Sequence, residues 1–291
     1  MQAFVAQCIN GIATGSIYAL IVLGMNLLVL VRKVTYHGYS HIIMLSMGVC
    51  WLTLKYTDEN IPLAVIVMFL FAVVLTIITE PLFRPLARRG ADLETIVVGM
   101  GIGIIITEIM SQYVNQGASF SFPKAMTGGG VMIGTGLISF SLANVITLLA
   151  AVVVVALLMA FLYKTRQGRA LRAIAQNLKV AKTLGISFEK TGLIGFGIAG
   201  LLAGATALFL IMSLGYAGPT LGDTFAVKAL ILILFAGMGN LKGGIICAVL
   251  MGLVEAMALA FLPGRWTEAV FYGFIMVIIL WKPQGLFGSK T

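Results

Sequence analysis

The sequence predicts an all-α protein that crosses a membrane repeatedly, with eight to nine transmembrane helices. Hydrophobic residues make up 60% of the 291 positions and charged residues only 10%, and the mean hydropathy is +1.07. A chain of this composition cannot cover its core with a water-facing surface, so we expect it to lie in a bilayer. The apolar residues form long runs without the alternation that is typical of barrel strands.

Eight runs approach the roughly twenty helical residues that cross a hydrocarbon core of about 30 Å. They are 3–31, 40–57, 61–83, 93–113, 137–163, 191–213, 244–262 and 267–281. A ninth run, 225–238, is shorter, and the sequence leaves open whether it crosses fully or only dips into the membrane. We expect a single transmembrane domain over 1–291.

Lysine and arginine gather after alternate runs, and this pattern predicts the orientation. They follow the first, third, fifth and last runs, at Arg32 and Lys33, at Arg84, Arg88 and Arg89, within 164–190, and at Lys282 and Lys290. By the positive-inside rule these ends are cytoplasmic. No basic residue precedes Arg32, which favours an outside N-terminus, nine crossings and a C-terminus inside. The same absence predicts that no signal peptide is cleaved.

The most basic connection, 164–190, is predicted to be a cytoplasmic segment that meets a partner. It contains Arg166, Arg169, Arg172, Lys179 and Lys182, followed by Gly185. Arg169 and Arg172 are three residues apart and the two lysines repeat this spacing, so a helix would present paired cations to an acidic surface. The alternative is a basic loop that only orients the protein or contacts lipid headgroups.

Three ionisable residues lie within apolar runs and are candidates for a translocation path: Glu108, Lys228 and Glu255. Charges at membrane depth are costly and often functional. Lys228 could pair with one of the acids, whereas Glu108 and Lys228 are also close enough to run ends to reach the interface. His37 and His41 lack acidic or cysteine neighbours in the sequence, so we expect them to be interfacial residues and not metal ligands.

Glycine pairs four residues apart within apolar runs predict close packing of helices. The pairs are Gly11 and Gly15, Gly99 and Gly103, and Gly200 and Gly204. The sequence leaves open whether these contacts form within the chain or between subunits.

Several enzyme classes are excluded by motif. The chain has no G-x-x-x-x-G-K-[ST] phosphate loop, no nucleophile elbow and no H-E-x-x-H pair. Its cysteines, Cys8, Cys50 and Cys247, lie singly in apolar runs, so neither a disulfide nor a metal site is predicted. We expect a transport subunit without a cofactor of its own.

Four segments resemble the permease subunits of branched-chain amino acid type ABC importers, a family that also includes urea and amide permeases. The first helix carries Asn10-Gly11, GSIYAL at 15–20 and GMNL at 24–27. The others are GRALRAIAQNLKVAKTLGIS at 168–187, FAGMGNLKGG at 235–244 and KPQGLFG at 282–288. Their order and spacing extend the resemblance over nearly the whole chain.

This resemblance implies the fold of the larger importer permeases, of the cobalamin and ribose type. It implies inward movement of a small polar solute, a branched-chain amino acid or a related amino acid or amide, by alternating access. It implies a cytosolic ATPase pair that binds ATP and Mg²⁺ and contacts 166–186 and a second cytoplasmic turn at Gly239, Asn240 and Lys242. A second, related permease subunit, a binding protein docking on 114–136 and 214–224, and a bacterial inner membrane are further implications.

One segment departs from the family pattern. Many relatives carry N-F-A-H-G-E where this chain reads YHGYSH at 36–41, which leaves open a solute other than leucine, isoleucine or valine. The rival interpretation is a self-contained secondary transporter or channel, which predicts transport without a partner and an inverted repeat that we do not find in the sequence. A structural scaffold would leave the charges within apolar runs unexplained.

Overall fold

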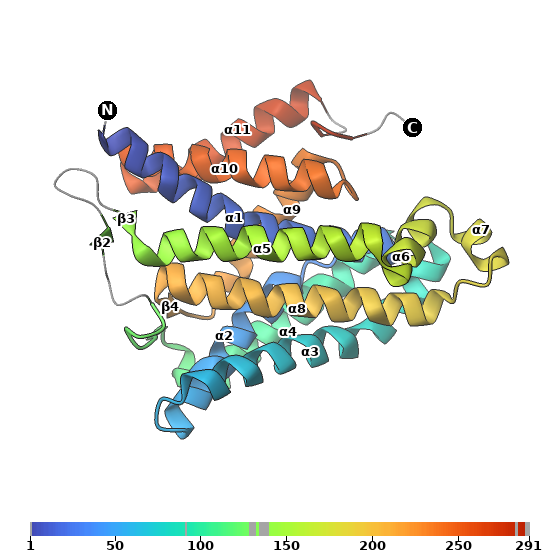
Figure 1. The fold of residues 1–291 in the computed structure, drawn as a ribbon, viewed down its shortest axis with the longest axis horizontal. Coiled ribbons are helices and arrows are strands. Elements are labelled where there is room, and N and C mark those ends of the chain that lie inside the picture. The colour runs from blue at the N-terminus through green and yellow to red at the C-terminus, as the bar shows by residue number, and fades with distance from the viewer. Residues whose placement is uncertain (1, 91, 128–131, 134–139, 283–284, 289–291) are drawn as a thin grey trace.

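The computed structural model describes residues 2–90, 92–127, 132–133, 140–282 and 285–288. Its long helices are α1 (Gln2–Arg32), α2 (Tyr39–Tyr56), α3 (Ile61–Arg89), α4 (Asp92–Tyr113), α5 (Leu142–Lys164), α8 (Phe188–Leu214), α9 (Leu221–Ala236), α10 (Leu241–Phe261) and α11 (Thr267–Trp281). The short α6 (Arg166–Gln176) and α7 (Leu178–Thr183) lie at one end of the molecule (Figure 1).

Two small strand pairs lie at the opposite end (Figure 1). Strand β1 (Phe120–Ser121) pairs antiparallel with β4 (Tyr216–Ala217), so that Phe120 is opposite Ala217. Strand β2 (Met132–Ile133) pairs antiparallel with β3 (Phe140–Ser141). The first pair fastens the segment before α5 to the turn between α8 and α9.

The prediction of an all-α protein with many membrane-spanning segments is confirmed. Six helices among the described residues are long and apolar enough to cross a membrane, namely α1, α3, α4, α5, α8 and α10. Helices α2, α9 and α11 are shorter, with 18, 16 and 15 residues. Helix α9 begins at Leu221, earlier than the predicted 225, and α5 begins at Leu142, while 134–139 lie outside the described residues.

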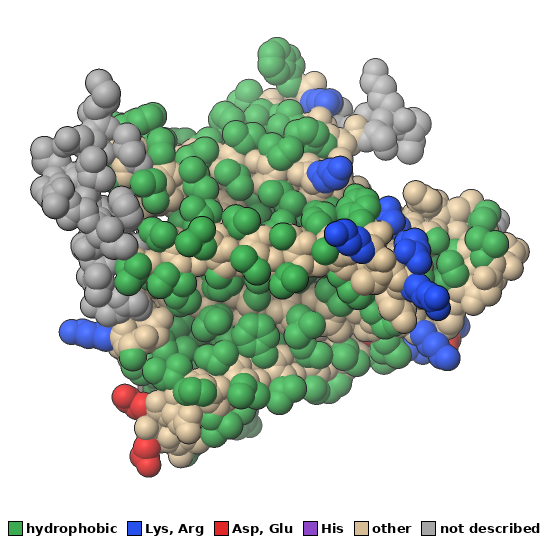
Figure 2. Space-filling view, in the orientation of Figure 1, with side chains coloured by type: hydrophobic (Ala, Val, Ile, Leu, Met, Phe, Trp, Pro, Cys, Tyr) green, Lys and Arg blue, Asp and Glu red, His purple; other side chains and the backbone are tan. Residues whose placement is uncertain are grey.

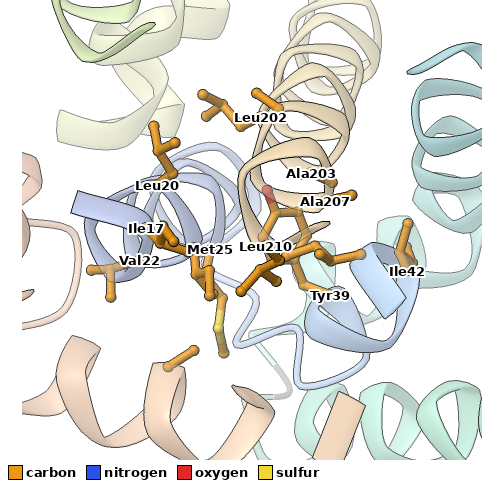
Figure 3. Packing of buried hydrophobic residues seen from close by; sticks show 14 of the residues in the cluster. Ile17, Leu20, Val22, Met25, Tyr39, Ile42, Leu202, Ala203, Ala207 and Leu210 are labelled. Atoms are coloured by element: carbon orange, nitrogen blue, oxygen red, sulfur yellow. The ribbon is translucent and has the colours of Figure 1, made fainter. Parts of the chain in front are cut away.

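Helix α1 is the centre of the bundle. Its most apolar window is 83% buried, against 22% for the windows of α3 and α5. Figure 3 shows α1 beside α8 with α2 on the far side of α8; the cluster includes Ile17, Leu20 and Met25 of α1, Leu202, Ala203, Ala207 and Leu210 of α8, and Tyr39 and Ile42 of α2. Val22 points to the opposite side of α1, where a Cβ at Gly244 of α10 would lie 3.0 Å from it. Since a helix of globular proteins keeps one polar face, burial all round indicates a core helix of a membrane bundle.

The predicted glycine pairs all lie at close contacts within the chain. A Cβ at Gly15 would lie 2.7 Å from the Cα of Val249 in α10, and one at Gly200 would lie 2.6 Å from the Cα of Val73 in α3. Gly11 and Gly204 extend these two contacts, onto Leu253 and Phe69 respectively. Gly99 and Gly103 of α4 face the segment 37–41. Small residues here allow helix backbones to approach closely.

Charge separates the two ends of the molecule. Lys and Arg side chains gather at the end that carries α6 and α7, and acidic side chains lie at the opposite end beside the α2–α3 turn (Figure 2). We call the first the basic end and the second, with β1–β4, the far end. The chain begins near the far end and its C-terminal segment lies at the basic end (Figure 1), as an odd number of crossings predicts.

The contact between α1 and α10 yields a first prediction. Gly15→Val should lower the unfolding midpoint of the detergent-solubilised protein, because the new side chain meets backbone that cannot yield; overpacking of this kind costs about 1–3 kcal/mol or more. Gly101→Val is the matched control, since nothing lies within 4 Å of a Cβ there. Equal midpoints for both variants in scanning fluorimetry would contradict the close packing of α1 on α10.

Candidate functional site

Two of the three predicted intramembrane charges meet. Lys228 Nζ of α9 donates to Glu255 Oε1 of α10 at 2.6 Å, and the two side chains are 8% and 12% exposed. The Tyr18 hydroxyl of α1 donates to Glu255 Oε2 at 2.5 Å and accepts from Lys228 Nζ at 3.1 Å. The ammonium also lies 5.2 Å from the ring centroid of Phe271. Each charge is therefore paired and hydrogen-bonded, as buried ions require.

This ion pair lines a pocket of about 410 Å³ between α1, α8, α9 and α10. Leu214 and Tyr216 also line it, which places the pocket toward the far end. Further polar side chains surround the pair in the lining, namely Gln7, Asn10, Thr14, Ser213 and Thr224. Ligand pockets commonly have volumes of about 300–1,000 Å³ with a few convergent polar groups, so the pocket can hold a small polar solute.

The third candidate, Glu108, lies apart from this cluster. It is exposed on α4, where its Oε1 accepts from Gln112 Nε2 at 2.7 Å. Glu108 does not line the pocket around Lys228. Its role in a path remains a prediction.

At the basic end, the two predicted cytoplasmic segments line one groove of about 500 Å³. Arg172 of α6 contributes from the first segment, and Gly239, Asn240 and Lys242 contribute from the turn between α9 and α10. The guanidinium of Arg172 lies 4.4 Å from the ring centroid of Tyr163, and Lys242 Nζ lies 5.9 Å from the same ring. The aromatic ring between the two cations holds them on one surface.

Local caps position α6 in this groove. Thr165 begins the helix, since its Oγ1 accepts from the backbone N–H of Gly168 at 3.0 Å. Arg172 Nε donates to the carbonyl of Leu162 at 3.1 Å, near the end of α5. A cation at this place satisfies carbonyl groups that the helix itself leaves free. Arg172 is therefore a structural anchor as well as a lining residue.

Hydrogen bonds also fix the opposite wall of the groove. Asn240 caps α10, accepting from the N–H of Gly243 at 2.9 Å, and its Nδ2 donates to the Phe287 carbonyl at 2.9 Å. The N–H of Gly239 donates to Asn26 Oδ1 of α1 at 3.0 Å. Phe287, in the C-terminal segment, thus contacts the turn between α9 and α10, although more than forty residues separate them in the sequence.

The remaining residues of the predicted cytoplasmic segment surround the groove. Arg166, Arg169 and Lys182 are exposed at the basic end. Gly185 ends this helical segment with a φ of +76°, a conformation that favours glycine. Lys179 lies in α7, and its side chain is outside the described part of the chain. The structure brings Arg172 to the second turn and leaves Arg166, Arg169 and Lys182 exposed.

Sequence reasoning missed a charge network beneath α6 and α7, which is buried at Arg32 and Glu80 and half exposed at Arg88 and Glu189. Arg32, at the end of α1, pairs with Glu80 of α3, and both side chains are fully buried. Arg84 Nη2 also donates to Glu80 at 2.6 Å, while Arg88 pairs with Glu189 of α8 at 2.5 Å. The signal was available, because Glu80 is the only acid in the third apolar run.

The network connects to the basic segment through one aromatic ring. The Arg32 guanidinium lies 3.9 Å from the ring centroid of Phe188, the first residue of α8. Phe188 in turn packs with Ile174 of α6 and Ala181 of α7. A displacement of α6 therefore bears directly on the ends of α1 and α8.

The comparisons with known proteins agree with this architecture. Residues 7–280 match the family model described as branched-chain amino acid transport system / permease component. The high-affinity branched-chain amino acid transport system permease protein BraD of Pseudomonas aeruginosa is 24% identical over 98% of this chain and 96% of its own length. The corresponding protein LivH of Escherichia coli K12 is 25% identical over the same shares.

A solved structure gives a weaker likeness. A chain of PsaBC from Streptococcus pneumoniae, in complex with Fab, aligns over 96% of this chain and 90% of its own, with 15% identity and a TM-score of 0.44.

The long apolar helices define a multi-pass membrane protein, and the family match places it among permease components. Because the family model covers nearly the whole chain, the chain belongs to the family of branched-chain amino acid transport system permease components.

The ion pair yields a second prediction. Lys228→Met should lower the unfolding midpoint strongly, because it leaves the Glu255 carboxylate without its cation; breaking a buried pair costs about 3–5 kcal/mol. The double variant Lys228→Met/Glu255→Gln should regain part of this loss, since neither charge remains. Glu108→Gln, at an exposed acid, should leave the midpoint within experimental error. A double variant less stable than Lys228→Met alone would contradict the pairing.

Proposed function

We propose that this chain is the permease subunit of an ATP-driven importer that moves a small amino-acid-like solute inward by alternating access. Family membership supports the transport role, and the relatives BraD and LivH, which are named as branched-chain amino acid transport permeases, suggest the solute class. The observation that carries the coupling is the groove in which Arg172 and Lys242 come together. We place the protein in a bacterial inner membrane, with the basic end inside.

The groove offers a docking surface for a cytosolic ATPase. Exposed cations around it favour an acidic partner surface, and attraction between such surfaces also aligns the partners. ATP and Mg²⁺ bind to the partner, and closure of an ATPase pair moves α6. Through Phe188 and Arg32 that movement reaches α1, α3 and α8, which allows rigid-body rocking of helices.

Toward the far end, the pocket around Lys228 and Glu255 forms part of the solute path. An amino acid carries one positive and one negative charge, so it can exchange partners with this ion pair as it passes. A second, related permease subunit supplies the other wall of the path. A binding protein delivers solute to 114–136 and 214–224, of which 128–131 and 134–136 lie outside the described residues.

A third prediction tests the ATPase contact. The chain, expressed with its neighbouring genes and purified in mild detergent, should carry a P-loop ATPase with ATP hydrolysis activity. The variant Arg166→Glu/Lys242→Glu should lose at least about tenfold of the bound ATPase, because two attractive contacts become repulsive. Arg172 is left in place since it anchors α6 to α5.

Lys124→Glu, an exposed change in the segment beside β1, is the matched control and should retain the ATPase. All variants should elute as monodisperse protein. A chain that purifies alone and moves solute in liposomes with an ion gradient and no ATP would refute the importer and support a secondary transporter.

A further inference from the structure

Helix α2 begins inside the bundle and not at the basic end where α1 ends. The Tyr39 hydroxyl, in its first turn, donates to the carbonyl of Ala199, eleven residues after the start of α8 at Phe188. A Cβ at Gly38 would lie 2.8 Å from the carbonyl oxygen of Gly99 in α4. The connection between α1 and α2 thus brings irregular backbone to membrane depth. Such backbone is tolerated only where it is buried in protein or lines a water-filled cavity.

His41 lies in the first turn of α2, directly after this connection, and between two glycines of other helices. A Cβ at Gly103 would lie 2.9 Å from its ring, and one at Gly222 would lie 2.8 Å from it. Gly103 is at the middle of the 22-residue α4, so the ring is far from both ends of that helix. His41 is 1% exposed, and its Nδ1 has no hydrogen-bond partner, as is also true of Ser40 Oγ. Such orphaned groups require an explanation.

The expectation that His41 has no acidic partner is wrong. Its Nε2 lies 2.9 Å from Oδ1 of Asp223, a residue 182 positions away in the first turn of α9. The pairing was invisible in the sequence because it depends on how α2 and α9 pack.

Asp223 is far more exposed than Glu255, the acid that pairs with Lys228 of α9. Its side chain is 65% exposed, whereas that of Glu255 is 12% exposed. A carboxylate held beside the middle of the bundle cannot face hydrocarbon without a large cost. The side of α9 that carries Asp223 must therefore face water or a polar partner surface.

That side of α9 extends from Asp223 to the basic end. Val227, Leu234 and Met238 are exposed further along it. Leu234 and Met238 line a groove of about 530 Å³. Leu93 and Ile96 of α4 also line it, as do Lys33 and Thr35 of the connection between α1 and α2. The exposed side of α9 thus ends in a groove at the basic end, which is mostly apolar and has Lys33 and Thr35 as its polar side chains.

We propose that this side of α9 lines the water-filled translocation path, and that Asp223, held in place by His41, binds the ammonium group of the solute. The proposal rests on the proposed function, in which a second permease subunit forms the opposite wall. A carboxylate accepts charge-assisted hydrogen bonds from N–H donors. His41 occupies Oδ1, which leaves Oδ2 for the solute. The site therefore selects amines and amino acids over solutes that carry only a negative charge.

Thiol accessibility tests the water-filled path without requiring transport. The full-length chain with Cys8, Cys50 and Cys247 changed to Ala, expressed in cells with its partner subunits, receives Val227→Cys, one turn from Asp223. A cationic methanethiosulfonate reagent, with a trimethylammonium group, should be favoured over an anionic reagent with a sulfonate several-fold more strongly than it is by a free thiol in solution. Leu70→Cys is the matched control, since Leu70 is 61% exposed on the outer apolar side of α3 and should react with neither reagent.

Charge at position 223 should determine the preference. Asp223→Asn should reduce the rate ratio of the two reagents to the ratio that they show with a free thiol in solution, and Asp223→Glu should keep it above that ratio. Leucinamide, which carries an ammonium group, should slow labelling of Val227→Cys several-fold with Asp223 present and not in Asp223→Asn. Isocaproate, which lacks the amine, should not slow it.

Two results would overturn the proposal. Labelling of Val227→Cys as slow as that of Leu70→Cys would remove the path from this side of α9. A rate ratio or leucinamide protection that survives Asp223→Asn would remove the ammonium site. Failure of the importer function instead appears as loss of the co-purified ATPase, which these rates do not measure.

Discussion

The burial of α1 among α10, α8 and α5 is the constraint on which the rest of the structure depends. Lipid cannot solvate polar groups, so each polar side chain on this helix must find its partner within the protein. Tyr18 holds the Lys228–Glu255 pair, Asn26 holds the turn at Gly239, and Arg32 pairs with Glu80. One buried helix thereby contributes residues to the far-end pocket, the basic-end groove and the charge network. Glycine at position 15 allows the close approach of α10 to this helix.

This arrangement suits a protein that must transmit movement across a membrane. Phe188 contacts both α6 and Arg32, so a displacement of α6 would also displace the end of α1. Tyr18, on the same helix, is hydrogen-bonded to the ion pair. A packed core passes on such displacements and does not absorb them. The link is a physical contact between two sites, and its role in coupling follows from the proposed function. The exposed acid at Asp223 lies on a different side of α9 from Lys228, so the ammonium site proposed there is separate from the ion-pair pocket.

Hydropathy was sufficient for the membrane-spanning helices, because the bilayer imposes their length and apolar character. The orientation that the charges indicate stays a prediction. The pairing of Lys228 with an acid was one of several open possibilities, since only the packing of α9 on α10 brings Glu255, and not Glu108, within reach. Local sequence could not indicate that α2 starts inside the bundle, because the small and aromatic residues at 36–41 are equally compatible with a surface turn. The contact between His41 and Asp223 depends on that start. Contacts between helices that are distant in the sequence therefore could not be predicted where no charge or glycine pattern indicated them.

The central claim is that an ATPase docks on the groove at the basic end. Its most direct test is photo-cross-linking from benzoylphenylalanine introduced at Gln176, a groove-lining residue of α6, with the same probe at the exposed Tyr56 of the far end as control. We predict a cross-link to a P-loop ATPase from Gln176, with a yield that changes when ATP binds, and no such product from Tyr56. No ATPase cross-link from Gln176, or an equal one from Tyr56, would contradict the account.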